Sequence, residues 1–284
     1  MFKPLAHLSL LLAITMLFAS HANAQQSLIY ANSAGTRGID VIDAASGAII
    51  RTCVHNKGNG RGIVVVGNDG YLTVSGSGTV WKLNINTCAD LGVAFDTGLP
   101  GIATIAYDGT NFWVNEYNSP GNGAFLYSPT GTLLKSITLS KCVNNCDGVE
   151  YFEGKLISNR GDAALPIYDI YDLDGVLLTE GFINDPQGGR TTGIAYDGVN
   201  FWVSDIFLNR LRIYNGVTGD FIEFVDITGG NTLIEDLSVD YDQRPDTGGE
   251  PPVPVPTLDQ WGMILLTLGM AALGYAVIRR RRFN

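Results

Sequence analysis

The chain repeats one short unit five times, and this repeat limits its fold more than any other feature. Residues 101–114 closely match residues 192–203, and weaker copies occupy 62–74, 147–157 and 235–242. An acidic residue followed by glycine between two apolar strands is typical of a tight hairpin turn. Each copy therefore predicts strand, turn, strand. The acidic turn residues are Asp69, Asp108, Glu153, Asp197 and Asp242, spaced by 39, 45, 44 and 45 positions.

A second set of turns gives each unit two further strands. These turns lie at 44–47, 129–131, 173–175 and 217–219, and each stands between two β-branched or aromatic runs. Four short antiparallel strands in about 44 residues match one blade of a β-propeller. The sequence thus predicts an all-β, five-bladed propeller over residues 25–245.

The two ends of this domain predict how the ring closes. The mature chain opens with three strands (27–32, 38–43 and 48–52) and finishes with one lone strand (235–241). If the last strand completes the first blade, N-to-C strand pairing closes the ring and removes exposed edges. An open ring, or a six-bladed ring with a degenerate unit, is the alternative.

All four cysteines belong to the predicted propeller. Cys142 and Cys146 are close enough to staple one loop, which leaves Cys53 and Cys88 to join neighbouring repeats. An even number of cysteines in an exported chain favours disulfides. The competing interpretation is a metal site, but no second Cys-x-x-Cys pair and no histidine cluster accompanies them.

Six aromatic residues recur at matching places in the two best copies of the repeat. Their recurrence favours packing between blades over a ligand-binding box. They are Tyr107, Phe112, Trp113, Tyr196, Phe201 and Trp202.

Both ends of the chain are predicted to be targeting segments that lie outside the folded domain. Residues 1–24 contain Lys3, an apolar stretch and a small-x-small site, which indicates a signal peptide for the Sec pathway. Residues 246–255 are rich in proline and glycine and predict an extended stalk. The apolar run 261–278 is long enough to span a bilayer, and four arginines follow it on the expected cytoplasmic side. A plain anchor without processing would need the same helix.

The segment in front of this helix carries a recognisable motif, Pro256, Thr257, Leu258, Trp261 and Gly262. Together with the helix and the basic tail, residues 256–284 closely resemble the bacterial IPTL-CTERM sorting signal. This signal is related to the PEP-CTERM tails that exosortase-type transpeptidases process. Val255 stands where the motif has isoleucine. The resemblance implies anchoring in the inner membrane facing the periplasm, or release to the cell surface after processing by such an enzyme.

The charge of the exported part limits its partners. Residues 25–250 hold 27 acidic and 13 basic residues, for a net charge near −14. Nucleic acid is excluded as a partner, because phosphate binding requires clustered cations. His55 is the one histidine that remains after the signal peptide, and its Gly/Asn-rich loop predicts a solvated residue rather than a catalytic one.

Polar residues that follow the second strand of each blade, or lie between blades, should converge on one rim of the ring. Such oxygen ligands would suit Ca²⁺, and propeller lactonases of the gluconolactonase type use a comparable set, which is a likeness of fold alone. An acidic rim that only solvates the protein is the plainer interpretation. The candidate residues are Asn115, Glu116, Asp147, Glu150, Asn159, Asp205 and Asp236.

The predicted function is therefore a non-catalytic binding or scaffolding propeller at the cell envelope or surface, with a glycan or a protein as ligand. The alternative is a divalent-metal-dependent hydrolase or lyase that acts in the periplasm or outside the cell.

The mass of the mature protein tests the predicted processing at both ends. We expect an N-terminus near Gln25 and a C-terminus that stops short of Asn284. Intact-mass analysis of the protein from its native envelope would measure both. A chain that still ends at Asn284 would contradict processing and leave simple anchoring.

Overall fold

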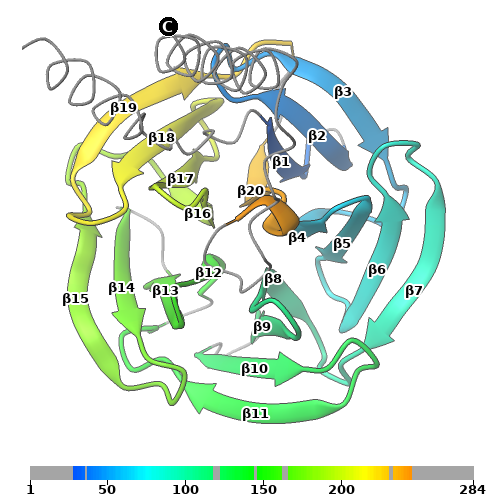
Figure 1. The fold of residues 1–284 in the computed structure, drawn as a ribbon, viewed down its shortest axis with the longest axis horizontal. Helices are drawn as coiled ribbons and strands as arrows, with labels where there is room; N and C mark the ends of the chain where they lie inside the picture. The colour runs from blue at the N-terminus through cyan, green and yellow to red at the C-terminus, as the bar shows by residue number, and fades with distance from the viewer. Residues whose placement is uncertain are drawn as a thin grey trace, which may run out of the picture. The chain divides into compact units, whose positions relative to one another are not determined.

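Five four-stranded antiparallel sheets surround one axis in the computed structural model (Figure 1). The structure describes residues 28–35, 37–117, 122–143, 146–161, 166–229 and 233–244. Within these residues the predicted all-β, five-bladed propeller is confirmed. The inner strand of each blade lies along the axis, and the outermost strand lies at the circumference.

In every blade the innermost strand is followed by three strands that lie progressively further from the axis. Blade 1 contains β20 (Ile234–Ser238), β1 (Leu28–Ser33), β2 (Gly38–Asp43) and β3 (Ile49–Val54). Blade 2 contains β4 (Gly60–Val66), β5 (Asp69–Val74), β6 (Thr79–Asn84) and β7 (Asp90–Asp96). Blade 3 contains β8 (Ile102–Tyr107), β9 (Phe112–Glu116), β10 (Gly123–Tyr127) and β11 (Leu133–Thr138). Blade 4 contains β12 (Val149–Phe152), β13 (Lys155–Asn159), β14 (Ile167–Tyr171) and β15 (Leu177–Asn184). Blade 5 contains β16 (Thr191–Tyr196), β17 (Asn200–Asp205), β18 (Arg210–Asn215) and β19 (Phe221–Asp226).

The predicted closure of the ring is confirmed, because β20 pairs antiparallel with β1 and completes blade 1. Three side chains at alternate positions, two in β20 and one just after it, also fasten this segment to β4 of blade 2 and the residue that follows β4. Asp236, Ser238 and Asp240 accept hydrogen bonds from the backbone N–H groups of Ile63, Val65 and Gly67, at 3.1, 3.0 and 2.8 Å. Since alternate residues of a strand share one face, the short polar pattern Asp-x-Ser-x-Asp builds this contact.

The inner strands approach one another so closely that they need glycine at one level of the ring. A Cβ atom on Gly62 would lie 2.9 Å from the Cα of Thr104, and one on Gly193 would lie 2.2 Å from the Cα of Asp236. On Gly148 it would lie 2.0 Å from the carbonyl oxygen of Thr192. The hydrogen side chain is therefore a packing requirement at this level.

The pairing of four inner strands also shifts register near this level. Short polar residues on the second strand accept hydrogen bonds from the backbone N–H groups at three of the bulges. Thr73 accepts from Gly62 (2.6 Å), Asn115 accepts from Thr104 (3.1 Å), and Ser204 accepts from Gly193 (3.0 Å). A buried backbone N–H without an acceptor is costly, so these side chains stabilise the bulges.

Polar side chains also link every blade to the next near the axis. At least one hydrogen bond of this kind crosses each of the five interfaces. They are Asn32 Nδ2 to Gly62 O (2.7 Å), Thr73 Oγ1 to Ala103 O (2.5 Å), Val149 N to Thr104 Oγ1 (3.1 Å), Tyr168 Oη to Thr192 O (2.9 Å) and Thr192 Oγ1 to Ile234 O (3.4 Å).

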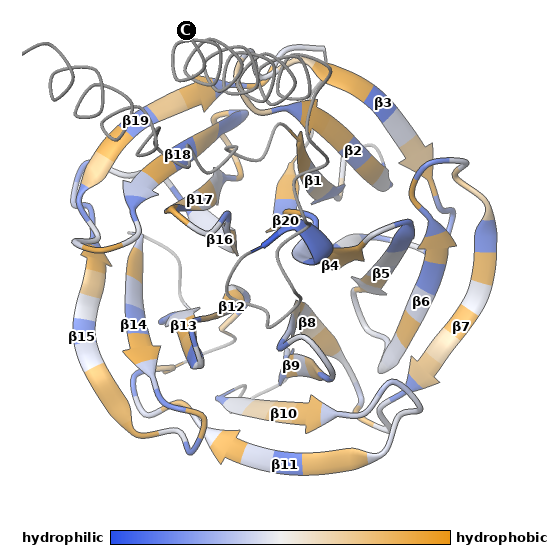
Figure 2. Ribbon diagram, viewed as in Figure 1, coloured by the Kyte–Doolittle hydropathy of each residue, from blue (hydrophilic) through white to orange (hydrophobic). Residues whose placement is uncertain are grey.

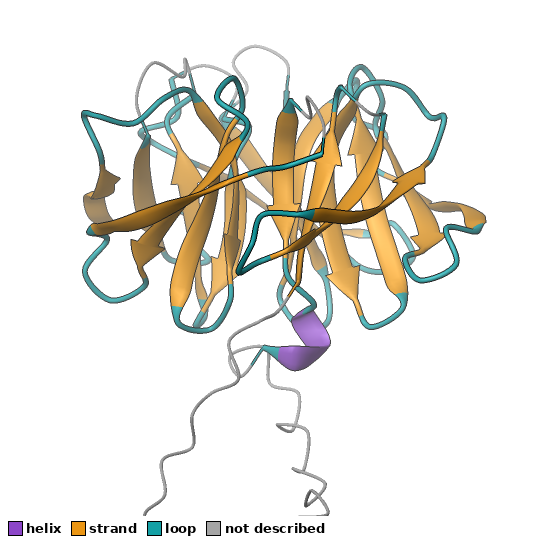
Figure 3. Cartoon of the chain, turned by 90° about the horizontal axis from the view of Figure 1, so that it is seen from above, coloured by secondary structure: helices purple, strands orange, loops and turns teal. Residues whose placement is uncertain are grey.

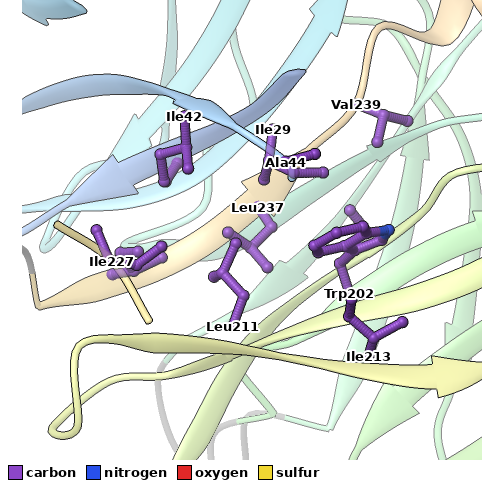
Figure 4. Close-up of a cluster of buried hydrophobic side chains, with 12 residues drawn as sticks. Ile29, Ile42, Ala44, Trp202, Leu211, Ile213, Ile227, Leu237 and Val239 are labelled. Atoms are coloured by element: carbon purple, nitrogen blue, oxygen red, sulfur yellow. The ribbon is translucent and has the colours of Figure 1, made fainter. Parts of the chain in front are cut away.

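The hydrophobic cores lie between blades, as the recurrence of aromatic residues predicts. Phe112, Trp113, Phe201 and Trp202 are each at most 2% exposed. Figure 4 shows Trp202 of blade 5 among aliphatic side chains of blades 1 and 5. The indole N–H of Trp202 donates to Asp197 at 2.8 Å, so the acidic turn residue also satisfies the buried ring.

Both predicted disulfides are present. Cys53 of β3 bonds to Cys88 in the β6–β7 turn and joins blades 1 and 2. Cys142 bonds to Cys146 and closes a short loop before β12. In the chain-entropy view, the first bridge closes the longer loop and stabilises the fold more, by about 3–4 kcal/mol.

The propeller has two different faces. We call "turn face" the side with the tight turns inside each hairpin, such as 67–68 and 153–154, and "loop face" the side with the connections between blades. The 3₁₀-helix η2 (Tyr241–Gln243) follows β20 on the turn face (Figure 3). Leu28, the first residue of β1, lies at the same end because it pairs with Asp43 beside a turn. The described chain thus enters and leaves on the turn face.

Several predictions fall on residues outside the described ranges. They concern the signal peptide 1–24, the stalk 246–255, and the segment 256–284 with its helix 261–278. They stay predictions. Among the described residues, no helix is long and apolar enough to cross a membrane.

The close approach of the inner strands predicts a sharp difference between two glycines. Gly193→Ala should lower the free energy of unfolding by about 1–3 kcal/mol, because its Cβ atom would clash with the backbone of β20. Gly70→Ala is the matched control, since the nearest atom to its Cβ would lie at an ordinary 3.4 Å. Denaturant unfolding of both variants measures the difference, and equal stabilities would contradict the packing argument.

Candidate functional site

The structure distributes the seven predicted rim residues among different environments. Asn115 is fully buried and accepts hydrogen bonds from both the backbone and the hydroxyl of Thr104. Asp236 is also fully buried and accepts from the backbone of Ile63. Burial raises the pKa of Asp236 well above its usual value. These two side chains fasten the inner strands together.

The side chain of Glu150 lies at the turn-face end of the axis. Its carboxylate accepts hydrogen bonds from the Tyr241 hydroxyl, at 2.8 and 2.7 Å, and from the Arg244 guanidinium. Arg244 also donates to the backbone oxygen of Tyr151 and lies 4.2 Å from the Tyr241 ring. All three side chains are at most 2% exposed. Tyr241 and Arg244 therefore close the turn-face end of the axis around Glu150.

Asp205 belongs to a buried network between blades 4 and 5. Arg212 contacts Asp205 at 3.3 Å and Asp185 at 3.2 Å, and Tyr214 donates to Asp185 at 3.0 Å. Burial and Asp185 together raise the pKa of Tyr214 far above its usual value. The network pairs each charge that it buries, as a structural ion-pair cluster does.

Asp147 and Asn159 meet three other polar side chains at the loop-face end of the axis. Arg61 forms an ion pair with Glu235 at 2.8 Å and donates to the Tyr117 hydroxyl at 3.2 Å. Its guanidinium also lies 4.4 Å from the centre of the Tyr117 ring. Asn159 Nδ2 donates to Asp147 at 2.9 Å. We call Arg61, Tyr117, Asp147, Asn159 and Glu235 the "mouth cluster". Glu116, half-buried at the end of β9, is the neighbour of Tyr117 in sequence.

The two carboxylates of the mouth cluster both have raised pKa values. Burial raises the pKa of Glu235 to about 7, and the charge of Asp147 adds to this against the opposing effect of Arg61. Burial likewise raises the pKa of Asp147, against its hydrogen bond with Asn159 and the charge of Arg61. One arginine thus serves two acids, and the cluster can accept or release a proton near pH 7.

The mouth cluster also holds two buried polar atoms whose hydrogen-bonding capacity is unused. Among the described atoms, Arg61 Nε and Asn159 Oδ1 have no hydrogen-bond partner. The cluster brings donors, acceptors and an aromatic ring together from four blades, which suits a hydroxyl-rich or polar ligand. No group of three or more His, Cys, Asp or Glu side chains that could hold a metal ion occurs among the described residues.

Sequence analysis did not single out Arg61. The residue before the tightest level is Ala103, Asp147, Thr192 or Glu235 in the other blades, so a single arginine at a position that is acidic in two copies was the available signal. The prediction that His55 is solvated was wrong, because the residue is only 8% exposed. Its Nδ1 accepts from the backbone N–H of Lys57 at 3.1 Å. Burial and the charge of Lys57 lower its pKa to about 4, so it is neutral at pH 7.

Comparison with known proteins characterises the tail and the fold. The IPTL-CTERM motif matches residues 253–282. No curated protein matches the chain. Among solved structures, a chain from the crystal structure of a nidogen/laminin complex is similar, with 12% identity and a TM-score of 0.53 over 75% of this chain and 97% of that chain. Glutaminyl cyclase from Myxococcus xanthus is also similar, with 15% identity and a TM-score of 0.49 over 60% and 71% of the two chains. At these identities the likeness concerns the fold alone.

The fold and the tail together define a class: a five-bladed β-propeller followed by an IPTL-CTERM sorting motif. The motif match includes Pro256, Thr257, Leu258, Trp261 and Gly262, as the resemblance implied. Such a tail is consistent with an exported, envelope-associated protein.

The raised pKa of Glu235 predicts that stability depends on pH. Between its usual value of 4.5 and about 7, the folded state keeps a proton that the unfolded chain has lost. This contribution to the free energy of unfolding is full below pH 4.5 and disappears as the pH rises through about 7. Urea unfolding at pH 5 and pH 8 should therefore show a smaller difference for Glu235→Gln than for the wild type. If Glu235→Gln showed the same difference in free energy of unfolding between pH 5 and pH 8 as the wild type, the raised pKa of Glu235 would be contradicted.

Proposed function

We propose that this chain is an exported envelope protein whose propeller binds a surface ligand, a glycan or a protein, at the mouth cluster without catalysing a reaction. The observation that carries this proposal is the set of polar and aromatic groups at the loop-face end of the axis, of which Arg61, Tyr117 and Asp147 remain partly exposed. Further along the axis, Asn115 and Asp236 join strands, and Glu150 is enclosed by Tyr241 and Arg244.

The direction of the chain supports the choice of face. Both ends of the described propeller lie on the turn face, and η2 closes the axis there. A tether that begins after Arg244 therefore leaves from the side opposite the mouth cluster. This supports the loop face as the face that meets the ligand.

The tail determines where the ligand is met. We propose that the segment 261–278 anchors the protein in the inner membrane facing the periplasm, and that an exosortase-type enzyme removes the tail to release the propeller to the surface. The motif match at residues 253–282 supports this route. Export by the Sec pathway through residues 1–24 belongs to the same proposal.

The alternative function is a divalent-metal-dependent hydrolase or lyase. It would require several carboxylates and amides that converge on one ion. Of the predicted ligands, Asp147 and Asn159 lie in the mouth cluster, whereas Glu150, Asp205 and Asp236 are bound to other partners. No observation in the described residues favours this alternative, and we propose the binding role.

Binding assays on the full-length protein in detergent test the proposal. The probes are an array of bacterial surface polysaccharides and intact envelope fractions. Tyr117→Ala should weaken binding at least tenfold, because aromatic anchors at the centre of a site carry much of the binding energy. Val217→Ser, 85% exposed on the turn face, is the control and should bind like the wild type. Thermal unfolding would verify that both variants fold. Absence of any binding by the wild type, or equal binding by Tyr117→Ala, would contradict the proposal.

A further inference from the structure

The outermost strand of blade 5, β19, exposes an unusual amount of apolar surface. Phe221, Ile222 and Phe224 are 44%, 47% and 46% exposed. Hydrophobic residues occur on several outermost strands (Figure 2). The other outermost strands expose aliphatic side chains, such as Leu91, Leu133 and Leu178, and among the described outermost strands β19 alone has large aromatic side chains exposed to this extent. Exposed aromatic clusters of this kind mark interaction sites more often than isolated aliphatic residues do.

The two aromatic rings on β19 are held in place by neighbouring side chains. The Arg210 guanidinium lies 4.2 Å from the centre of the Phe224 ring and pairs with Asp226 at 3.1 Å. Arg212 lies 5.7 Å from the Phe221 ring, and Tyr214 meets the same ring edge-on at 5.8 Å. The rings are therefore positioned before any partner arrives, which reduces the entropy lost on binding.

A hollow lies on each side of β19, and both hollows are acidic. The hollow shared with blade 1 has a volume of about 750 Å³ and is lined by Phe224 together with Asp43, Glu223 and Asp226. The hollow shared with blade 4 has a volume of about 340 Å³ and is lined by Phe221 and Asp220. Neither lining includes a lysine or an arginine. Arg210 and Arg212 pair with Asp226 and Asp185, whereas Asp43, Asp220 and Glu223 form no ion pair within the described residues, so these three acids give the surface its negative charge.

The backbone of β19 is also the least protected edge of the propeller. It pairs with β18 alone and contains no lysine, arginine or proline. Proteins protect edges with such residues and with bulges. Arg51 lies in β3 and Lys135 lies in β11, and the pairings of β7 and β15 each shift register twice. The β19 pairing shifts once, near Phe221, and is regular from Glu223 to Asp226.

We propose that β19 and its two hollows form a docking surface for an extended peptide segment of a partner protein, with alternating apolar and basic side chains. The segment adds as a fifth strand to blade 5, so that the free backbone groups of β19 supply hydrogen bonds. Its apolar side chains cover Phe221 and Phe224, and its basic side chains reach Glu223 and the acids of the hollows. This site is separate from the mouth cluster.

A second copy of this chain fits the same surface less well. If two β19 strands paired edge to edge, Glu223 and the acids around it would meet their own equivalents. Like charges that face each other across strands are destabilising. The charge of the surface therefore favours a basic partner over self-association.

A peptide-binding experiment on the full-length protein in detergent tests this proposal. The probe is a fluorescein-labelled octapeptide that alternates lysine with valine, and its glutamate–valine counterpart measures the role of charge. Fluorescence anisotropy should show binding of the lysine peptide alone. The double variant Phe221→Ser/Phe224→Ser should weaken this binding at least tenfold, and Glu223→Lys should weaken it several-fold.

The double variant Leu133→Ser/Leu134→Ser on β11 is the matched control, because these residues are 51% and 52% exposed on another outermost strand. It should bind the lysine peptide like the wild type. The proposal is overturned if the wild type does not bind this peptide, if both double variants lose binding equally, or if Glu223→Lys has no effect. A concentration-dependent dimer that is lost in Phe221→Ser/Phe224→Ser would assign the surface to a second copy and also overturn it. Thermal unfolding of each variant separates loss of binding from loss of fold.

Discussion

The close approach of the five inner strands is the constraint on which the rest of the structure depends. At its tightest level Gly62 lies against Thr104, Gly148 against Thr192 and Gly193 against Asp236, and a Cβ atom on any of these glycines would collide with the neighbouring backbone. The strands bulge near this level, and short polar residues of the second strands accept hydrogen bonds from the N–H groups that the bulges leave. Polar residues near the axis are therefore necessary for folding before they are available for binding.

This requirement separates the chemistry of the axis into two ends. On the turn face, Tyr241 and Arg244 enclose Glu150, and a buried pair of this kind is costly to break but forms no open site. On the loop face, Arg61, Tyr117 and Glu235 meet where the strands diverge from the tight level. The face that holds the candidate site is thus opposite the face where the chain leaves.

The sequence predicted the fold well because its signals are local and repeated. Asp-Gly turns, alternating apolar residues and recurrent aromatics specify hairpins that pack as blades, and the count of strands at the two ends implied that β20 would join β1. Cysteine spacing predicted both disulfides. The site was predicted less well. Glu150 and Asp205 were expected on an open rim, yet they form ion pairs with Arg244 and Arg212. No local sequence pattern predicts such pairs, because the two partners lie on different strands or segments.

The sequence by itself determined the repeat, the closed ring and the sorting motif, because each depends on residues near one another in the chain or on strands counted in order. Only the tertiary structure decided which polar residues hold the ring together and which remain at its mouth. The tertiary structure also determined that His55 is buried beside Lys57 and that the aromatic rings of β19 are exposed. The physical reason is that burial and pairing are properties of neighbours in space. Arg61 and Glu235 are 174 positions apart, and they meet because the last strand closes the first blade.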